Sequence, residues 1–170
     1  MGEVEQSSEL AVAADTLWEE VGTLAGVNRE LGPWLRMTAS RDLRDATLAD
    51  LTPGRPAGRA WLLLGGLIPV DYDDLCIESI GERSFHERSR MLTMDPWRHE
   101  RTIEELGPRA CRITDRLRFS LRPLPARVPG ADRLAATIVA ALFRHRHRRL
   151  AKLYGQPSQR GGECTNERDP

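Results

Sequence analysis

The sequence predicts an α+β fold in which a curved antiparallel β-sheet wraps around one long C-terminal helix, with two short helices after the first strand. Two patterns support this expectation. Strand-like runs separated by Gly and Pro fill the middle of the chain, and a helical pattern then continues from Ala131 to Tyr154. Strands joined by short turns pair antiparallel. The long helix must bury its apolar stripe, and the sheet is the surface available to cover it.

The chain begins with a strand and two short helices. Loose alternation predicts the strand at Val4 to Val12. In the first helix, Asp15 is placed to accept hydrogen bonds from the exposed amides of the first turn, and apolar residues recur at helical spacing until Gly26, a plausible stop. The segment from Val27 to Leu35 is predicted as a second short helix or turn, which a Gly-Pro pair breaks.

The sheet is predicted from alternating or densely apolar runs. The run from Gly58 to Ile68 is apolar enough to be a central strand buried on both faces, with a bulge or bend at Gly65 and Gly66. We expect a loop or edge strand at Leu43 to Pro56 and a turn at Pro69 to Asp74. The strand candidates are Gly58 to Ile68, Leu75 to Ile80, Ser84 to Leu92, Trp97 to Glu105 and Ala110 to Leu121.

The long helix closes the predicted domain. Asp132 lies in its first turn, where a negative charge complements the helix dipole, and Gly155 is a C-terminal stop. Residues 1–155 are therefore expected to form one domain, and residues 156–170, which have almost no apolar side chains, a disordered tail. The apolar face of the helix is predicted from Leu134, Ile138, Val139, Leu142, Phe143, Leu150 and Leu153.

Composition excludes several classes of protein. Lys plus Arg and Asp plus Glu are each 25, so the net charge is +0 and no overall field attracts nucleic acid. No apolar run approaches the roughly 20 residues that span a bilayer, and the N-terminus has no basic and apolar signal segment. Cys76, Cys111 and Cys164 lack CxxC spacing, and the first two fall in strand-like runs, which favours buried free thiols in a reducing compartment. We expect a cytoplasmic protein.

Strand parity places four ionisable side chains on inward faces. Side chains alternate between the two faces of a strand, and Glu87, His99, Arg101 and Asp115 share their faces with apolar residues such as Phe85. Buried charges cost several kcal/mol each unless they are paired or hydrated. Two interpretations remain open: a ligand cavity, in which the Arg and the His hold a polar group and the carboxylates orient them, or an ionic network that only stabilises the sheet.

Other clusters of polar residues give weaker signals. His99 with Asp115 has the residue types for acid–base chemistry, so both are candidate catalytic residues, but no motif defines a reaction. In the run from Arg144 to Arg149, His145 and His147 are not expected to share a metal ion, because residues two apart on a helix do not face each other. The run is predicted to be a solvated face near the C-terminus of the helix, where cations are favoured. Asp71, Asp73 and Asp74 are interpreted as solvated carboxylates of a turn. Neither a metal nor a cofactor is expected.

Element order and local sequence resemble the SRPBCC superfamily, whose helix-grip fold is shared by START lipid-transfer domains, pollen-allergen-like proteins and polyketide cyclases. The segments that carry the resemblance are AADTLWEEVGTLAGVNRELGPWLRMT, WRHERTIEEL, CRITDRLRF and LFRHRHRRLAKLYG. The resemblance covers about residues 4–155 and points to an uncharacterised bacterial ligand-binding subgroup. It implies a deep, mostly apolar cavity between the sheet and the long helix, with cavity positions for His99 and Asp115.

The leading hypothesis is a protein that binds a small hydrophobic or aromatic molecule, lipid-like or polyketide-like, in that cavity. One alternative is a cyclase or aromatase-like enzyme that uses His99 or Arg101 with a carboxylate. Another is an interaction module that uses the basic end of the long helix. The oligomeric state, including a homodimer, is left open. The predicted ligand-binding residues are Trp34, Trp61, Leu63, Ile77, Glu87, Trp97, His99, Arg101, Asp115, Leu117, Ile138 and Leu142.

Overall fold

The computed structural model describes residues 1–157, apart from the side chains of residues 41 and 42. Its seven strands form one antiparallel sheet in the order β1-β7-β6-β5-β4-β3-β2. The strands are β1 (Gly2–Leu10), β2 (Leu35–Met37), β3 (Pro56–Leu64), β4 (Ile68–Ile80), β5 (Ser84–Met91), β6 (Met94–Gly107) and β7 (Ala110–Leu121). The helices are α1 (Ala14–Val21), α2 (Leu24–Leu31), α3 (Arg41–Arg44), the 3-10 turn η1 (Leu48–Asp50), α4 (Pro123–Ala126) and α5 (Ala131–Tyr154).

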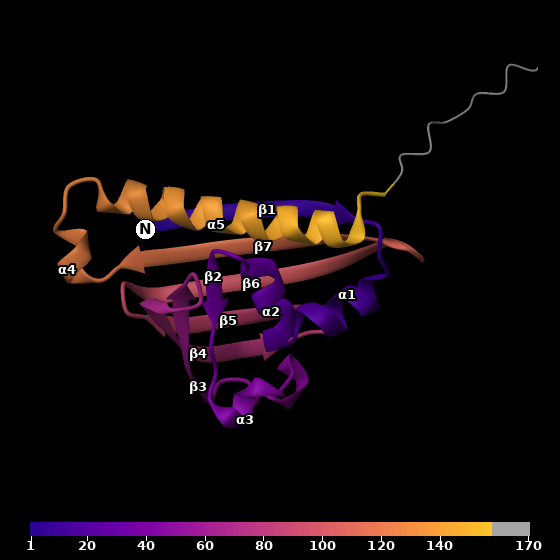
Figure 1. The fold of residues 1–170 in the computed structure, drawn as a ribbon, viewed down its shortest axis with the longest axis horizontal. Helices are drawn as coiled ribbons and strands as arrows, with labels where there is room; N and C mark the ends of the chain where they lie inside the picture. The colour runs from indigo at the N-terminus through magenta and orange to yellow at the C-terminus, as the bar shows by residue number, and fades with distance from the viewer. Residues whose placement is uncertain (158–170) are drawn as a thin grey trace, which may run out of the picture.

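The long helix α5 and the short helices α1 and α2 pack side by side on the same inner face of the sheet. Figure 1 shows α5 running along β1 and β7, with α1 and α2 beside β6 and β5 and the α3 segment below them. The first strand pairs with the last, from Gly2 opposite Phe119 to Leu10 opposite Cys111. This arrangement confirms the predicted α+β architecture of a sheet, two short helices and a long final helix.

Two apolar clusters hold α5 on the sheet. One joins Leu10, Leu17 and Ile113 to the C-terminal half of the helix at Leu150. The other includes Trp97, Leu117, Phe119, Val139 and Phe143, with Trp97 stacked at a tilt on both Phe rings. Large aromatic side chains therefore fill the space beneath the N-terminal half of α5.

The predicted boundaries of the first two helices were wrong. The first helix ends at Val21, and Gly26 lies in the first turn of α2, where its amide donates to the Thr23 hydroxyl at 3.0 Å. A Cβ on Gly26 would lie 2.0 Å from the Glu20 carbonyl oxygen, so glycine permits the close approach of the two helices. Asp15 does not cap α1; its carboxylate pairs with Arg83 at 2.6 Å.

The sheet also differs from the prediction between β2 and β4. Gly65 and Gly66 have φ of +59° and +78° and form the turn of the β3–β4 hairpin, rather than a bulge within a strand. The predicted turn at Pro69 to Asp74 is part of β4. The short edge strand β2 was not predicted, and β3 beside it is not buried on both faces, since Trp61 is 42% exposed. The predicted loop at Leu43 to Pro56 contains the end of α3 and the turn η1.

The buried face of α5 is rotated from the predicted one. It consists of Ala135, Val139, Phe143, Arg146, His147 and Leu150, whereas Leu134, Ile138 and Leu153 are exposed. No helix among residues 1–157 is long and apolar enough to cross a membrane. Cys111 is buried and Cys76 is half-buried, both as free thiols. Cys164 and nearly all of the tail predicted to be disordered lie outside the described residues.

Candidate functional site

A buried ionic network lies between the two apolar clusters, and Arg101 is at its centre. This side chain on β6 is 1% exposed and directs four hydrogen bonds to two carboxylates. Its Nη1 and Nη2 donate to Glu30 on α2, each at 2.9 Å, and its Nε and Nη2 donate to Asp115 on β7 at 2.7 and 2.8 Å. Arg101 therefore ties the sheet to α2.

The helix α5 completes the network. Arg146 donates from Nε to Glu30 at 2.8 Å, and His147 places Nε2 2.9 Å from Asp115 and Nδ1 2.9 Å from the Ser8 hydroxyl. The interpretation of residues 144–149 as one solvated face was thus wrong for Arg146 and His147, which are buried. Two arginines face two carboxylates, so the charges of this group are balanced.

The ion pairs shift the pKa values of both carboxyls. Burial alone would raise the pKa of Asp115, but the charge and hydrogen bonds of Arg101, together with hydrogen bonds from His147 and His99, hold it well below the usual range. Burial would likewise raise the pKa of Glu30, and the charges of Arg101 and Arg146 lower it instead. Both groups are therefore carboxylates at neutral pH.

His99 links this network to Glu87 on the neighbouring strand β5. Its Nε2 lies 2.8 Å from Asp115 Oδ1 and its Nδ1 lies 3.4 Å from Glu87 Oε2. The rings of Phe85 and Phe143 pack edge-on against the imidazole, with centroids 5.1 and 5.2 Å away. Burial would lower the pKa of His99, but the hydrogen bonds and charges of Asp115 and Glu87 outweigh it and raise that pKa. Both ring nitrogens are engaged, so neither is free to abstract a proton from a ligand.

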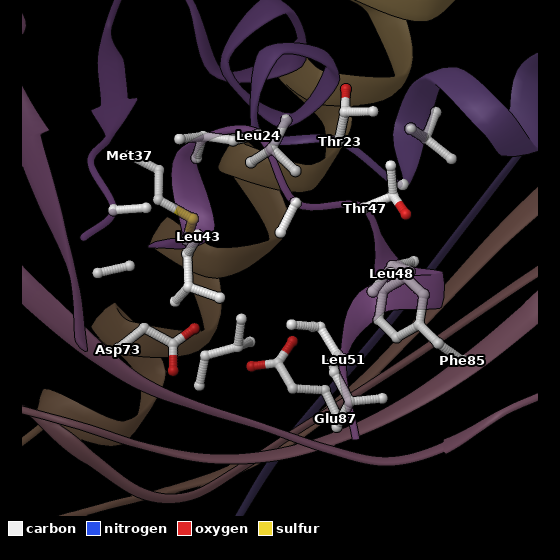
Figure 2. A pocket seen from close by; sticks show the side chains of 18 of the residues that line it. Thr23, Leu24, Met37, Leu43, Thr47, Leu48, Leu51, Asp73, Phe85 and Glu87 are labelled. Carbon is white, nitrogen blue, oxygen red and sulfur yellow. The ribbon is translucent and has the colours of Figure 1, made fainter. Parts of the chain in front are cut away.

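A cavity of about 140 Å³ opens beside His99. Figure 2 shows its side chains converging from β4 and β5 on one side and from α2 and the segment around α3 and η1 on the other. Its lining is mostly apolar and includes Leu24, Val27, Leu43, Leu75, Ile77 and Phe85. Of α5, only Arg146 is among the lining residues. The cavity thus lies under α2 and residues 37–51 rather than under the long helix.

Two carboxyl groups lie next to each other in the wall of this cavity. Asp73 and Glu87 are 4% and 7% exposed, and Figure 2 shows their carboxyl groups turned toward each other. Among the described residues, Asp73 Oδ1 and Glu87 Oε1 are buried without a hydrogen-bond partner. Burial and the charge of Glu87 raise the pKa of Asp73 well above the usual range. Asp73 was wrongly interpreted as a solvated turn residue, because β4 extends further than predicted.

The structure brings the predicted polar residues together but disperses the predicted apolar ones. Glu87, His99 and Arg101 line the cavity, as does Ile77, and Asp115 lies directly behind the His and the Arg. The other predicted lining residues are absent from its wall. Trp34, Trp61 and Ile138 are exposed, Leu63 and Leu142 are half-buried, and Trp97 and Leu117 lie in the cluster beneath α5.

Four polar residues of the site were not predicted. Asp73 follows the same alternation as Leu75 and Ile77, so strand parity would have found it had β4 been extended to Ile68. Glu30 and His147 sit on apolar helix faces, a pattern that a search for buried polar positions could have flagged. Arg146 gave no such signal, because it lies within a run of basic residues.

Several solved structures share this fold. The START superfamily protein from Mycobacterium smegmatis is 16% identical and aligns over 90% of this chain and 99% of its own, with a TM-score of 0.59. The ZhuI aromatase/cyclase from Streptomyces sp. R1128 is 13% identical over 89% and 92% of the two chains, with a TM-score of 0.64. Protein CV1439 from Chromobacterium violaceum is 9% identical over 92% and 100%, with a TM-score of 0.66. The chain therefore has an SRPBCC-like, helix-grip fold.

The chain belongs to the family described as a domain of unknown function, DUF8410, whose model matches residues 8–154. A comparison with curated proteins finds no match.

Proposed function

We propose that the protein binds a small apolar or aromatic molecule in the cavity between β3–β6 and the cover formed by α2 and residues 37–51. The observation that carries this proposal is the cavity itself, about 140 Å³ in volume, with mainly aliphatic and aromatic walls. An apolar cavity of about 150 Å³ accommodates a molecule the size of benzene. The buried polar network gives this space a fixed inner wall, because His99 and Arg101 are held on several sides.

Native mass spectrometry of the protein purified from its own cells, followed by denaturing extraction, tests the proposal. A retained small hydrophobic molecule supports it and identifies the ligand class. A variant that fills the cavity is the control: Ala60 is buried in the cavity wall on β3, so Ala60→Leu should prevent retention, whereas Ala49→Leu at the exposed turn η1 should not. Equal retention by both variants would place the ligand elsewhere.

An enzyme of the cyclase or aromatase type has weaker support. Structural likeness to an aromatase/cyclase favours it. However, both nitrogens of His99 are engaged, and Arg101 gives its hydrogen bonds to Glu30 and Asp115. Neither group has the freedom that polarising a ketone requires. The interaction module is also less well supported, because Arg146 and His147 of the basic run are internal.

A further inference from the structure

We propose that the ligand carries a protonated amine, which Asp73 and Glu87 receive at the polar wall of the cavity. The inference deepens the proposed function and rests on it. It assigns the chemical class of the ligand: a molecule about the size of benzene with one cationic nitrogen.

The unpartnered oxygen atoms carry this inference. Buried polar atoms are almost always hydrogen-bonded, and leaving one unsatisfied costs about 1–3 kcal/mol. Asp73 Oδ1 and Glu87 Oε1 have no partner in the described part of the chain, although both side chains line the cavity. When both groups are ionised, as the charge of a bound cation would favour, their oxygens accept and do not donate, so the complementary ligand group is a donor.

The surrounding charges favour a cationic donor over an anion. Arg101 and Arg146 also line the cavity, but their guanidinium groups are already paired with Glu30 and Asp115. An anionic ligand would lie beside two acidic groups that disfavour a negative charge. The two arginines in the wall are already paired with carboxylates and would not offset this. An ammonium group, with several N–H donors, can bond to both orphan oxygens at once.

The rest of the ligand must be apolar. On the sides away from the two carboxyls, the cavity is lined by aliphatic side chains and by Phe85. Thr23 and Thr47, labelled in Figure 2, add two hydroxyls to the wall, and these already donate to the Glu20 carbonyl and the Asp50 carboxylate. A compact ring with an aminomethyl group matches this division into one polar and several apolar walls.

Binding of the ammonium should release a proton. The carboxyl of Asp73 faces Glu87 and Ser89 on β5 and Asp71 on its own strand. His99, Arg101 and Arg146 lie farther along the wall, and the described lining residues of α2, β3 and residues 37–51 are uncharged. Burial and the charge of Glu87 raise the pKa of Asp73, which favours a proton on this carboxyl when no ligand is bound. The ammonium replaces that proton, which leaves to solvent, so affinity should rise with pH until the amine itself loses its charge.

Calorimetric titration of the whole chain with four probes tests the inference: benzylamine, benzyl alcohol, toluene and benzoate. A charge-assisted hydrogen bond contributes enough to make benzylamine bind about tenfold to hundredfold more tightly than toluene. Titration in two buffers of different ionisation enthalpy should show proton release with benzylamine. Asp73→Asn and Glu87→Gln should lose the preference. Asp74→Asn, the matched control on the same strand with its carboxylate paired to Arg59 at the surface, should keep it.

The outcomes separate the inference from the proposed function. If toluene, benzyl alcohol or benzoate binds as tightly as benzylamine, the cavity binds ligands but the amine assignment is wrong. The assignment also fails if Asp73→Asn and Glu87→Gln retain the benzylamine preference. If none of the four probes binds, the proposed function and the inference both fail.

Discussion

Replacing Arg101 by Met should destabilise the protein more than any exchange of a surface arginine. The substitution keeps the length and apolar stem of the side chain and removes four hydrogen bonds and one buried charge. Glu30 would keep Arg146, and Asp115 would keep the two histidines, so the carboxylates lose part of their partners. Breaking a buried ion pair from one side costs about 3–5 kcal/mol.

Urea-induced unfolding followed by circular dichroism measures this change in the free energy of unfolding. Arg116→Met is the matched control: Arg116, on the solvent face of β7, pairs with Glu5 at 3.0 Å and is 53% exposed. Exposed pairs of this kind contribute about 1 kcal/mol or less. If Arg101→Met prevents folding altogether, the milder Glu30→Gln should give a measurable loss. A loss for Arg101→Met no greater than for Arg116→Met would refute the view that the network anchors α2 to the sheet.

Three further predictions concern pH and the cavity. Burial and the charge of Glu87 raise the pKa of Asp73 in the folded state. The free energy of unfolding should therefore fall as pH rises from about 4, the pKa of Asp in the unfolded chain, toward the folded pKa. Asp73→Asn should raise the melting temperature at pH 7 and flatten its pH dependence. Despite burial, arginine charges lower the pKa values of Glu30 and Asp115 in the folded state. The two ionised carboxylates therefore contribute to the free energy of unfolding above pH ~4, and this contribution is lost as pH falls through the lowered folded pKa values. Urea titrations between pH ~2 and ~5 should show the unfolding midpoint declining as the pH is lowered. Ala60→Leu should weaken benzylamine binding about tenfold or more while leaving the far-ultraviolet circular dichroism spectrum unchanged, because it fills space that the ligand needs.

Strand parity was the strongest predictor of the site. Alternation along a strand is a local property, so Glu87, His99, Arg101 and Asp115 could be placed on inward faces from the sequence alone, and the structure brings them together. Parity gives a face but not a partner. Whether those charges faced a ligand or one another depended on residues elsewhere in the chain.

The partners could not be derived from local pattern. Glu30 and Arg101 are 71 residues apart and meet because α2 packs over the sheet. Arg146 reaches the same carboxylate from a third element, 116 residues away from Glu30. The position of the cavity depended in turn on how α5 is rotated: burial of Val139 and Phe143 turns Ile138 outward, so the predicted wall beneath the helix is instead filled by aromatic side chains.

The most direct test of the account is a crystal structure of the protein grown with saturating benzylamine. The account predicts a ring enclosed among Leu43, Ile77 and Phe85, with the nitrogen within hydrogen-bond distance of both Asp73 and Glu87. An empty cavity, or a ring bound at another place such as the outer face of α5, would contradict it.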